Sequence, residues 1–506
     1  MRQPSLIHKT NKLMLRKLRI IAATIFFALI TLLFLDFTGT LHAWFGWLAK
    51  IQFLPAVMAL NVGVIVLLVA LTLLFGRVYC SVICPLGVMQ DVIAWMGKKS
   101  KKNRYTYSAA KTCLRYGVLA LFVVLMVAGF ASIAILVAPY SAFGRIAQNL
   151  FAPLYAWGNN LLAYFAERAD SYTFYSTDVV IGSIGTFAVA AVTFVVVAVL
   201  AWRNGRTYCN TICPVGTVLG ALSRFSLLKP VIDTDKCINC NICSKNCKAA
   251  CIDIPNHAID YSRCVTCMDC IEKCPKNAIS YTRRSTVKTA EAKPAAETNT
   301  ARRNFLIGAG LVAAEAVRAQ EMRGDGGFAV ILDKQAPDRE NPLTPPGSRS
   351  FRNLTQHCTG CQLCVAVCPT KVLRPSADLK SFMQPTMSYE QGYCRPECNK
   401  CSQVCPAGAI KPITVEEKSS IQIGHAVWVK KNCIVVADDV DCGNCERHCP
   451  TKAITMVPLD PANPESRKIP TVNDSLCIGC GACENLCPSR PFSAIYVKGY
   501  QSHLRY

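Results

Sequence analysis

The chain has 506 residues, more than one ordinary domain contains, and 30 of them are cysteine. Hydrophobic residues make up 52% and charged residues only 17%, whereas soluble globular domains average about 25% charged residues. This composition excludes a small disulfide-rich secreted protein and a disordered chain, and it predicts a large membrane portion. The formal net charge of +23 on its own would favour nucleic acid or an anionic membrane surface.

The part of the chain before residue 205 contains four apolar segments, at 20–41, 54–75, 117–138 and 179–201. Each has about 20 residues, which is enough for a helix to cross a hydrocarbon core of about 30 Å. We expect Asp36 at the outer interface, followed by Trp44 and Trp47 as part of an aromatic belt. A cleaved signal peptide is the alternative for the first segment, but its length and the lack of a small-residue cleavage site disfavour it.

The distribution of lysine and arginine residues indicates the orientation of the apolar segments in the membrane. They cluster before the first apolar segment, between the second and third, and after the fourth, whereas the loops at 42–53 and 139–178 contain few. The positive-inside rule therefore places the N-terminus, residues 76–116 and the chain after 203 in the cytoplasm. We predict a four-helix transmembrane domain over 1–230, in a bacterial cytoplasmic (inner) membrane.

Two copies of the motif G-R-x-Y-C-x-x-I-C-P-x-G follow the second and fourth apolar segments. They contain the pairs Cys80/Cys84 and Cys209/Cys213. Because residues at i and i+4 share one helix face, pseudo-symmetric pairing of the copies would supply four thiolates, the number that one [4Fe-4S] cluster requires. The alternative is that each pair is a structural or redox-active dithiol.

Residues 231–282 are predicted to form a cytoplasmic two-cluster ferredoxin domain. They contain two runs with the spacing C-x2-C-x2-C-x3-C, in which three cysteines bind one cubane and the fourth binds the other. The predicted ligand sets are Cys237, Cys240, Cys243 with Cys274, and Cys264, Cys267, Cys270 with Cys247. Zinc ribbons are the disfavoured alternative. Cys251 is an additional cysteine that we expect to be a buried thiol, and Lys248 stands where a proline usually follows the fourth cysteine.

A linker is predicted at 283–300, where the chain is rich in Ala, Thr, Lys and Glu. Residues 301–320 begin with Arg302-Arg303-Asn304-Phe305-Leu306 and resemble a twin-arginine export signal. That pathway exports folded proteins, so it predicts a periplasmic domain over 321–506. The alternatives are a solvated arginine pair before an amphipathic helix, and a dinucleotide-binding glycine pattern that lacks the preceding strand. Cleavage near Ala316 or Ala319 would release a separate periplasmic protein.

The predicted periplasmic domain has four further cysteine tetrads, each ending in Cys-Pro. They are Cys358/Cys361/Cys364/Cys368, Cys394/Cys398/Cys401/Cys405, Cys433/Cys442/Cys445/Cys449 and Cys477/Cys480/Cys483/Cys487. Spacing leaves open whether fourth ligands are exchanged between consecutive tetrads or in a nested order, first with last. Cys113 belongs to no set and is interpreted as inert.

Six oxidised [4Fe-4S] clusters with four thiolates each would lower the net charge to roughly +11, so we expect no nucleic-acid partner. No histidine lies inside an expected span and no C-x-x-C-H occurs, so we expect no haem. We identify no P-loop, no convincing flavin or nicotinamide site and no catalytic residue. The chain is expected to move single electrons.

Residues 18–281 resemble the NapH-type membrane ferredoxins and, more broadly, the CcoG proteins and the membrane part of NosR. The resemblance rests on the four apolar segments, the two Cys-x3-Cys-Pro repeats and the adjacent two-cluster domain. Residues 301–490 resemble the NapG/MauM-type ferredoxins through the twin arginine and four tetrads. These resemblances imply that a membrane part takes electrons from quinol and that an exported part passes them to a periplasmic reductase. This sequence departs from them by joining both in one chain.

We therefore predict a multidomain membrane protein, an α-helical transmembrane bundle with α+β ferredoxin-like domains. It would transfer electrons between the quinone pool or a cytoplasmic donor and a periplasmic reductase or cytochrome. The alternatives are an accessory factor that keeps a metalloenzyme centre reduced or assembled, and a redox sensor. A core of about 30 Å is too wide for one useful tunnelling step. The hypothesis therefore needs a cofactor inside the boundary: the seventh cluster, a quinone or a partner haem.

Overall fold

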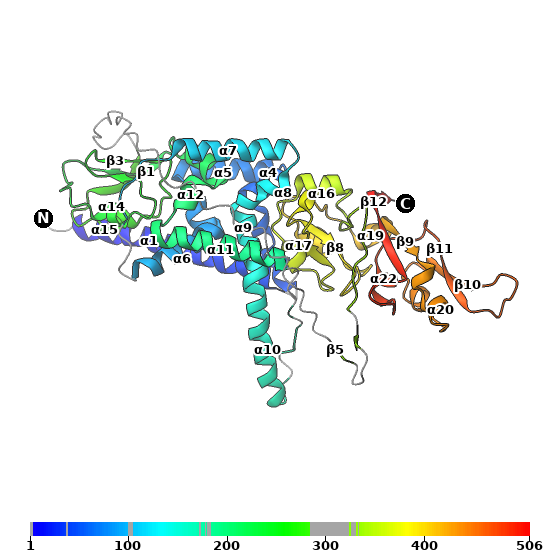
Figure 1. The fold of residues 1–506 in the computed structure, drawn as a ribbon. Helices are drawn as coiled ribbons and strands as arrows, with labels where there is room; N and C mark the ends of the chain where they lie inside the picture. The colour runs from blue at the N-terminus through cyan, green and yellow to red at the C-terminus, as the bar shows by residue number, and fades with distance from the viewer. Residues whose placement is uncertain are drawn as a thin grey trace.

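A computed structural model describes residues 4–36, 39–99, 105–171, 174–177, 179, 184–283, 323–324, 330–331 and 333–505. The expected linker, from residue 284, and the twin-arginine segment lie outside the described residues. The described residues form a helical module (4–223), a first ferredoxin module (228–283) and a C-terminal module (333–505). Figure 1 shows the two cysteine-rich modules at opposite ends of the helical module.

Eight longer helices of the described residues make up most of the helical module: α1 (Pro4–Leu35), α5 (Val62–Phe75), α6 (Pro85–Lys99), α7 (Thr112–Val127), α9 (Pro139–Ile146), α10 (Ala152–Arg168), α11 (Ile184–Asn204) and α13 (Pro214–Ser223). Shorter turns connect them: α2 (Thr40–Phe45), α3 (Trp47–Lys50), α4 (Phe53–Met58), η1 (Tyr79–Ile83), α8 (Ala131–Ala134), η2 (Ile135–Val137), η3 (Ala147–Phe151) and α12 (Thr207–Thr211). Helices α6 and α11 pack against each other, and α1 packs along η1 and α6.

Two helices of the described residues are long and apolar enough to cross a membrane, Met14–Leu35 within α1, and α11. The prediction of four uninterrupted spans is not confirmed. The second apolar segment is divided at Leu60, whose φ of 52° ends α4, and Asn61 caps α5 by accepting a hydrogen bond from the Val64 amide. The third is divided at Gly129, whose φ of 86° follows the end of α7.

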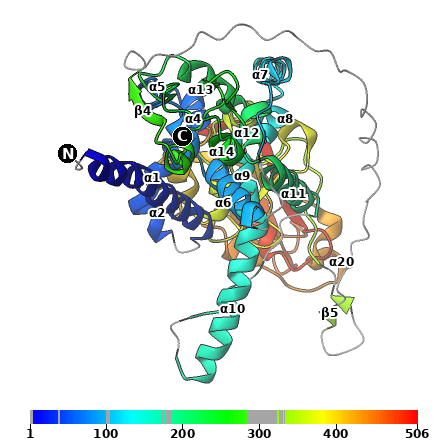
Figure 2. The same ribbon diagram turned by 90° about the vertical axis from the view of Figure 1, so that its left-hand side faces the viewer.

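The expected loop at 139–178 contains helices α9 and α10. Helix α10 projects from the body of the molecule in both views (Figures 1 and 2). Its exposed side chains include Trp157, Leu161 and Phe165. The returning chain is attached to α10 by amide hydrogen bonds of 2.8 Å from Asn159 to the Tyr175 carbonyl and from Asn160 to the Thr177 carbonyl.

The first ferredoxin module contains two small antiparallel sheets and two short helices. The pairs are β1 (Leu228–Ile232) with β4 (Ile279–Arg283), and β2 (Ile252–Asp253) with β3 (Ala258–Ile259). Helices α14 (Ile242–Asn246) and α15 (Asp269–Lys273) contact each other, and α15 also contacts α1. This α+β arrangement agrees with the ferredoxin-like domain predicted from the cysteine spacing.

The C-terminal module has three antiparallel strand pairs: β7 (Leu373–Pro375) with β8 (Pro385–Met387), β9 (Ile421–Trp428) with β12 (Ile495–Arg505), and β10 (Ile454–Pro458) with β11 (Lys468–Val472). Its helical turns are α16 (Phe351–His357), α17 (Leu363–Ala366), η5 (Leu379–Ser381), α18 (Lys400–Val404), α19 (Val415–Ser419), η6 (Lys430–Asn432), α20 (Ile434–Ala437), α21 (Asn444–Arg447) and α22 (Ala482–Leu486). A further pair, β5 (Arg323–Gly324) and β6 (Val330–Ile331), precedes it. The strands and helical turns of this module are short, so by themselves they bury little apolar surface.

Candidate functional site

The four thiols of the repeated motif lie together in the interior of the helical module. Cys80, Cys84, Cys209 and Cys213 are each at most 4% exposed. Cys84 and Cys213 each interact electrostatically with thiols of the other copy. The shared chain geometry of the copies explains this, because each second cysteine directly precedes a helix that begins with proline, α6 or α13. The structure thus brings together the two pairs that the sequence analysis assigned to one site.

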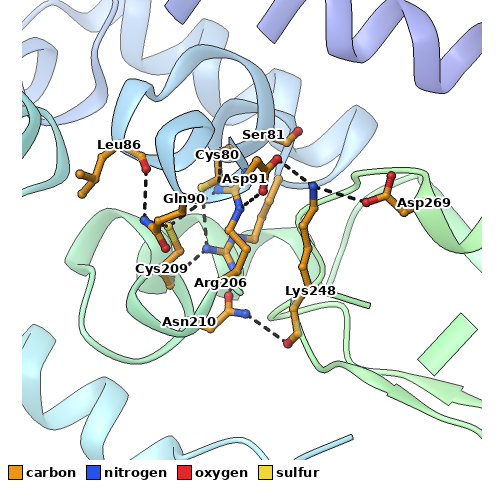
Figure 3. Close-up of polar contacts among 12 residues, drawn as sticks. Cys80, Ser81, Leu86, Gln90, Asp91, Arg206, Cys209, Asn210, Lys248 and Asp269 are labelled. Carbon is orange, nitrogen blue, oxygen red and sulfur yellow. Dashed lines mark hydrogen bonds and ion pairs between the residues drawn. The ribbon is translucent and has the colours of Figure 1, made fainter. Parts of the chain in front are cut away.

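Two buried arginines, one from each copy of the motif, reach across to the other copy. Arg206 donates a 2.7 Å hydrogen bond to the Cys80 carbonyl, and Arg77 donates a 3.2 Å hydrogen bond to the Cys209 carbonyl. The same guanidinium groups lie 3.7 Å (Arg77 to Cys80) and 3.9 Å (Arg206 to Cys209) from a sulfur atom. Both arginines are 0% exposed. Figure 3 shows Arg206 between Cys80 and Cys209. Two fixed positive charges therefore face the thiols.

The last glycine of each motif makes room for these arginines. A Cβ atom at Gly87 would lie 2.3 Å from the Cys80 carbonyl oxygen and 2.7 Å from Arg206 Nη1. A Cβ atom at Gly216 would lie 2.2 Å from the Cys209 carbonyl oxygen and 2.9 Å from Arg77 Nη2. Real Cβ atoms do not approach so closely, so the close contact of backbone and guanidinium requires glycine at both positions.

A charged network connects the helical module to the first ferredoxin module. Asp91 on α6 accepts from Arg206 Nε at 2.6 Å, and it forms ion pairs with Lys248 at 2.8 Å and Arg19 at 3.1 Å. Lys248 also lies 3.4 Å from Asp269. Burial alone would raise the pKa of Asp91, but these cations hold that pKa well below its usual range. Lys248, which replaces the expected proline, therefore serves as a contact between modules (Figure 3).

In the first ferredoxin module the structure brings together both predicted sets of thiols. One small cavity is lined by Cys237, Cys240, Cys243 and Cys274, and another by Cys247, Cys264, Cys267 and Cys270. Each cavity combines three thiols of one run with the fourth thiol of the other. A void surrounded by four thiols fits a cubane, because soft sulfur ligands on four corners are what iron–sulfur clusters require.

Cys251 is buried, as expected, but it is not remote from this site. Its sulfur lies 3.5 Å from that of Cys247, it interacts with Cys264, and it lines the second cavity. The structure therefore places a further thiol, which the spacing did not assign to any set, beside two predicted ligands.

In the C-terminal module consecutive tetrads exchange their fourth thiols, which answers the question that spacing left open. Cys368 lines a cavity with Cys394, Cys398 and Cys401. Electrostatic interactions follow the same rule and relate Cys405 to Cys358 and Cys364, Cys487 to Cys445, and Cys449 to Cys477 and Cys480. Cys394 donates its amide to the Cys480 carbonyl at 2.9 Å, so the two pairs of tetrads are adjacent. The nested order is not observed in the part of the chain that the structure describes.

Cys442 is, like most of the predicted ligands, only partly buried, and among the described tetrad cysteines it is Cys240 that is exposed. The chain that leads to Cys442 is exposed, since Val440 and Asp441 both face solvent. Cys442 itself is only partly buried, whereas Cys433, the ligand before it in the third tetrad, is buried. The reason is that the widened gap between these two cysteines is occupied by α20 and an exposed turn.

The contacts of Cys442 place it beside the other thiols of the third set. It interacts electrostatically with Cys445 and packs against the apolar cluster that contains Cys433 and Cys487. Cys442 is thus near the other thiols of its predicted set, and its burial is like that of most tetrad cysteines. Its assignment as a cluster ligand stays a prediction, as does that of every other tetrad cysteine.

The C-terminal module packs directly against α9 of the helical module. A Cβ atom at Gly144 would lie 2.2 Å from the Cys361 carbonyl oxygen, so the two backbones are in direct contact. Ser141 donates to the Thr359 carbonyl, and the Asn149 amide donates to Gln362 at 2.9 Å. One continuous hydrophobic core includes thiols of all three modules, among them Cys80, Cys84, Cys361 and Cys364, with Cys267 packed against it.

Burial affects the thiols of the two cysteine-rich modules. It raises the pKa of Cys243 to about 11 and the pKa values of Cys361 and Cys445 to about 12. These thiols therefore carry their protons at neutral pH, and the binding of a metal centre would release those protons. Within the described ranges no three His, Cys, Asp or Glu side chains converge on a single metal ion.

The structure also shows an acid–base pair that the sequence analysis did not single out. His42 Nδ1 lies 3.3 Å from Asp36 Oδ2, and their side chains are 6% and 3% exposed. His42 Nε2 is buried without a hydrogen-bond partner among the described residues. Asp36 also accepts the amides of Gly39 and Leu41, so one of its roles is to close the turn after α1. A carboxylate at the end of an apolar segment was the available signal.

Comparison with known protein families agrees with these groupings. Models described as 4Fe-4S binding domains match residues 57–103, 186–232 and 257–280, and a 4Fe-4S dicluster domain model matches residues 357–409 and 440–490. The first two matches contain the two copies of the repeated motif. The dicluster match at 357–409 contains the first two C-terminal tetrads, and the match at 440–490 contains the third and fourth without Cys433, in agreement with exchange between consecutive tetrads.

Three curated relatives have ferredoxin-type names. The methylamine utilization ferredoxin-type protein MauM of Methylobacillus flagellatus is 30% identical over 159 residues, 30% of this chain and 66% of MauM. MauN of Paracoccus denitrificans is 24% identical over 198 residues, 39% of this chain and 55% of MauN. The ferredoxin-type protein NapH of Haemophilus influenzae is 26% identical over 191 residues, 37% of this chain and 53% of NapH.

The chain is a NapH/MauM-like polyferredoxin. It contains several [4Fe-4S] binding domains, and its curated relatives have ferredoxin-type names. Its two long apolar helices and its NapH-like relatives indicate membrane association. The chain spans between about half and two thirds of the lengths of MauM, MauN and NapH. No solved structure gives a significant match.

Proposed function

We propose that this polyferredoxin conducts electrons across the bacterial inner membrane, between the quinone pool or a cytoplasmic donor and a periplasmic redox partner. The observation that carries the proposal is the continuous core that contains thiols of the repeated motif and of the C-terminal module and has Cys267 of the first ferredoxin module packed against it, with the two end modules on opposite sides (Figure 1). In this proposal the N-terminus and the first ferredoxin module are cytoplasmic, and the C-terminal module is periplasmic.

Seven [4Fe-4S] clusters would provide the path, each accepting and releasing one electron when bound. Six are assigned to the tetrads, with the exchange of fourth ligands described above. The seventh is assigned to Cys80, Cys84, Cys209 and Cys213. In this proposal the seventh site lies between the two groups of tetrads and divides a distance too wide for one tunnelling step into shorter steps.

The residues of this chain prepare the seventh site in two ways. Arg77 and Arg206 place positive charge beside the sulfurs, which favours thiolates in an interior where an unpaired charge is costly. Arg77 also donates to the Ser262 carbonyl at 3.1 Å, which connects the seventh site to the segment before Cys264. On the other side, Tyr140 interacts electrostatically with Cys361 and Cys405.

The arrangement across the membrane can be tested with sealed vesicles of known orientation. Protease added to right-side-out vesicles should digest residues 333–505 and spare residues 228–283, and inverted vesicles should give the reverse. Digestion of both modules from the same side would refute the transverse path. Iron analysis of the purified chain should give about 28 atoms, against about 24 for six clusters.

A further inference from the structure

A cavity of about 440 Å³ lies at the junction of the helical and C-terminal modules. Its walls come from the end of α1, from η3 and α10, from the segment that returns from α10, and from the chain between α17 and β7. This volume is within the range of about 300–1,000 Å³ that is typical of sites for small organic ligands. The cysteine cavities described above are much smaller, with a volume of about 20 Å³ each.

Much of the wall is apolar. Phe34 and Leu35 contribute from α1, Pro153 from α10, and Val365 and Leu373 from the C-terminal module. Helix α10 continues from the cavity with an exposed row of apolar side chains. An apolar ligand dissolved in the lipid would therefore meet a continuous apolar surface leading to the cavity.

Two polar side chains in the wall have hydrogen-bonding atoms that no described residue satisfies. Gln148 Oε1 and Arg374 Nε are both buried and have no hydrogen-bond partner among the described residues. The other side of the Arg374 guanidinium is occupied by Glu390. An unpaired buried polar atom costs about 1–3 kcal/mol, so an acceptor and a donor left open at one cavity point to a ligand with oxygen groups.

One thiol of the C-terminal module also lines the cavity. Cys368 is the fourth member of the set that includes Cys394, Cys398 and Cys401. A ligand in the cavity would thus contact the protein shell of a redox centre. This combination of apolar walls, open oxygen-binding atoms and a cluster thiol matches the chemistry of a quinol.

We propose that this cavity binds the head group of a lipid-soluble quinol, with the Gln148 amide oxygen accepting a hydrogen bond from one hydroxyl and Arg374 donating a hydrogen bond to the other oxygen. The proposal rests on the proposed function and locates its quinone-pool contact. Oxidation of one quinol to quinone releases two electrons and two protons. The loaded tetrads of the C-terminal module are the oxidant and take one electron each at two centres, and water at the outer surface takes the protons.

The experiment uses the full-length, cluster-loaded protein in lipid nanodiscs, with two readouts. The first is the rate at which decylubiquinol bleaches the clusters, and the second is the position labelled by an azidoquinone photoprobe, mapped by mass spectrometry. Ala156→Phe fills the cavity from α10, and Gln148→Leu removes the open acceptor. Ala166→Phe is the matched control, because it places the same side chain on the same helix outside the cavity. Iron content and reduction by dithionite report that each variant is folded and loaded.

We expect the photoprobe to label the chain around Gln148 or Val365. Quinol-driven bleaching should fall at least about tenfold in both cavity variants, the effect of one lost hydrogen bond or of steric exclusion. Ala166→Phe should behave as the unmodified protein does. If quinol bleaches all variants equally, or if the label lies elsewhere, the cavity is not the site although the proposed function stands. If quinol bleaches no cluster even in the unmodified protein, the quinol contact itself is refuted.

Discussion

Arg206 donates a 2.7 Å hydrogen bond to the carbonyl of Cys80, a residue 126 positions earlier in the chain. Arg77 makes the corresponding contact with Cys209 at 3.2 Å. Each copy of the motif therefore completes the site of the other copy. Each arginine thus contacts a sulfur atom of its own copy and a backbone carbonyl of the other copy.

The tight packing at the motif glycines can be tested by adding one methyl group. We expect Gly87→Ala to displace Arg206 or the Cys80 backbone, since the new Cβ atom would lie 2.3 Å from the Cys80 oxygen. Overpacking of this kind typically costs about 1–3 kcal/mol, and it should remove one cluster, about four iron atoms per chain. Iron analysis and thermal unfolding measure both effects.

Gly117→Ala is the control for this variant. Gly117 also lies in a helix, but a Cβ atom there would meet nothing within 4 Å. The change should leave the iron content unaltered and raise stability slightly, because alanine favours helix over glycine by up to about 1 kcal/mol. Full iron content in Gly87→Ala would contradict the structure at this position.

The seventh cluster can be removed separately from the other six. Cys209→Ser should lower the iron content from about 28 to about 24 atoms per chain and leave the signals of the ferredoxin-type clusters in place. Cys113→Ser is the matched control, because Cys113 is exposed and lies outside every group of thiols. Equal iron content in both variants would show that the four thiols of the repeat hold no cluster. Paramagnetic resonance of the reduced protein identifies which signal is lost.

The contact between modules through Lys248 predicts a clear stability effect. Lys248→Met removes the ion pairs to Asp91 and Asp269, whose side chains are largely buried. Asp91 keeps Arg19 and Arg206, so we expect a loss of about 2 kcal/mol, less than for a fully isolated buried charge. Faster proteolysis of residues 228–283 in detergent would report the loosened module.

Lys236→Met provides the comparison. Lys236 also pairs with an aspartate, Asp233, at 2.6 Å, but its side chain is 64% exposed. An exposed pair of this kind contributes little to stability, so proteolysis and thermal unfolding should not change. If both lysine variants behaved alike, the Lys248 network would not hold the modules together.

His503 predicts a pH dependence of the C-terminal module. Burial lowers its pKa to about 4, and its ring contacts Thr344 at 2.8 Å. The folded protein therefore keeps His503 neutral where the unfolded chain, with a pKa near 6.5, takes up a proton. Stability from this group is complete above about pH 6.5 and falls by up to about 1.4 kcal/mol per pH unit as the pH drops toward 4.

Thermal unfolding of the loaded protein between pH 7 and 5 measures this effect. His503→Gln removes the titrating group and should flatten that part of the profile. The same substitution at exposed His448 should leave the loss of stability at low pH in place. A profile for His503→Gln parallel to that of the unmodified protein would show that the buried imidazole does not contribute.

The local spacing of cysteines predicted a large share of the candidate site. Three cysteines at x2 spacing must lie on one turn of chain, so the groups around Cys240 and Cys267 could be recognised without a fold. The repeat containing Cys80 and Cys209 was visible for the same reason. The cysteine-rich modules could therefore be predicted from the sequence alone. Family comparison confirms several [4Fe-4S] domains.

Other features required the tertiary structure because they depend on contacts between distant segments. Exchange of Cys368 and Cys405 between consecutive tetrads depends on how two short segments pack, which spacing does not encode. The difference in burial between Cys433 and Cys442 depends on the exposed turn that lies between them. Hydropathy alone did not predict the breaks at Leu60 and Gly129, because a single left-handed residue changes backbone direction without changing average apolarity.

The sequence by itself determined which side chains can bind iron, since ligand type and spacing are local properties of the chain. Only the tertiary structure decided which distant thiols share a site, that Arg77 and Arg206 cross between the copies, and that Lys248 replaces a proline to join two modules. The physical reason is that buried charges and close backbone contacts are stable only when partners from other segments arrive together. Such partners have no fixed separation along the chain.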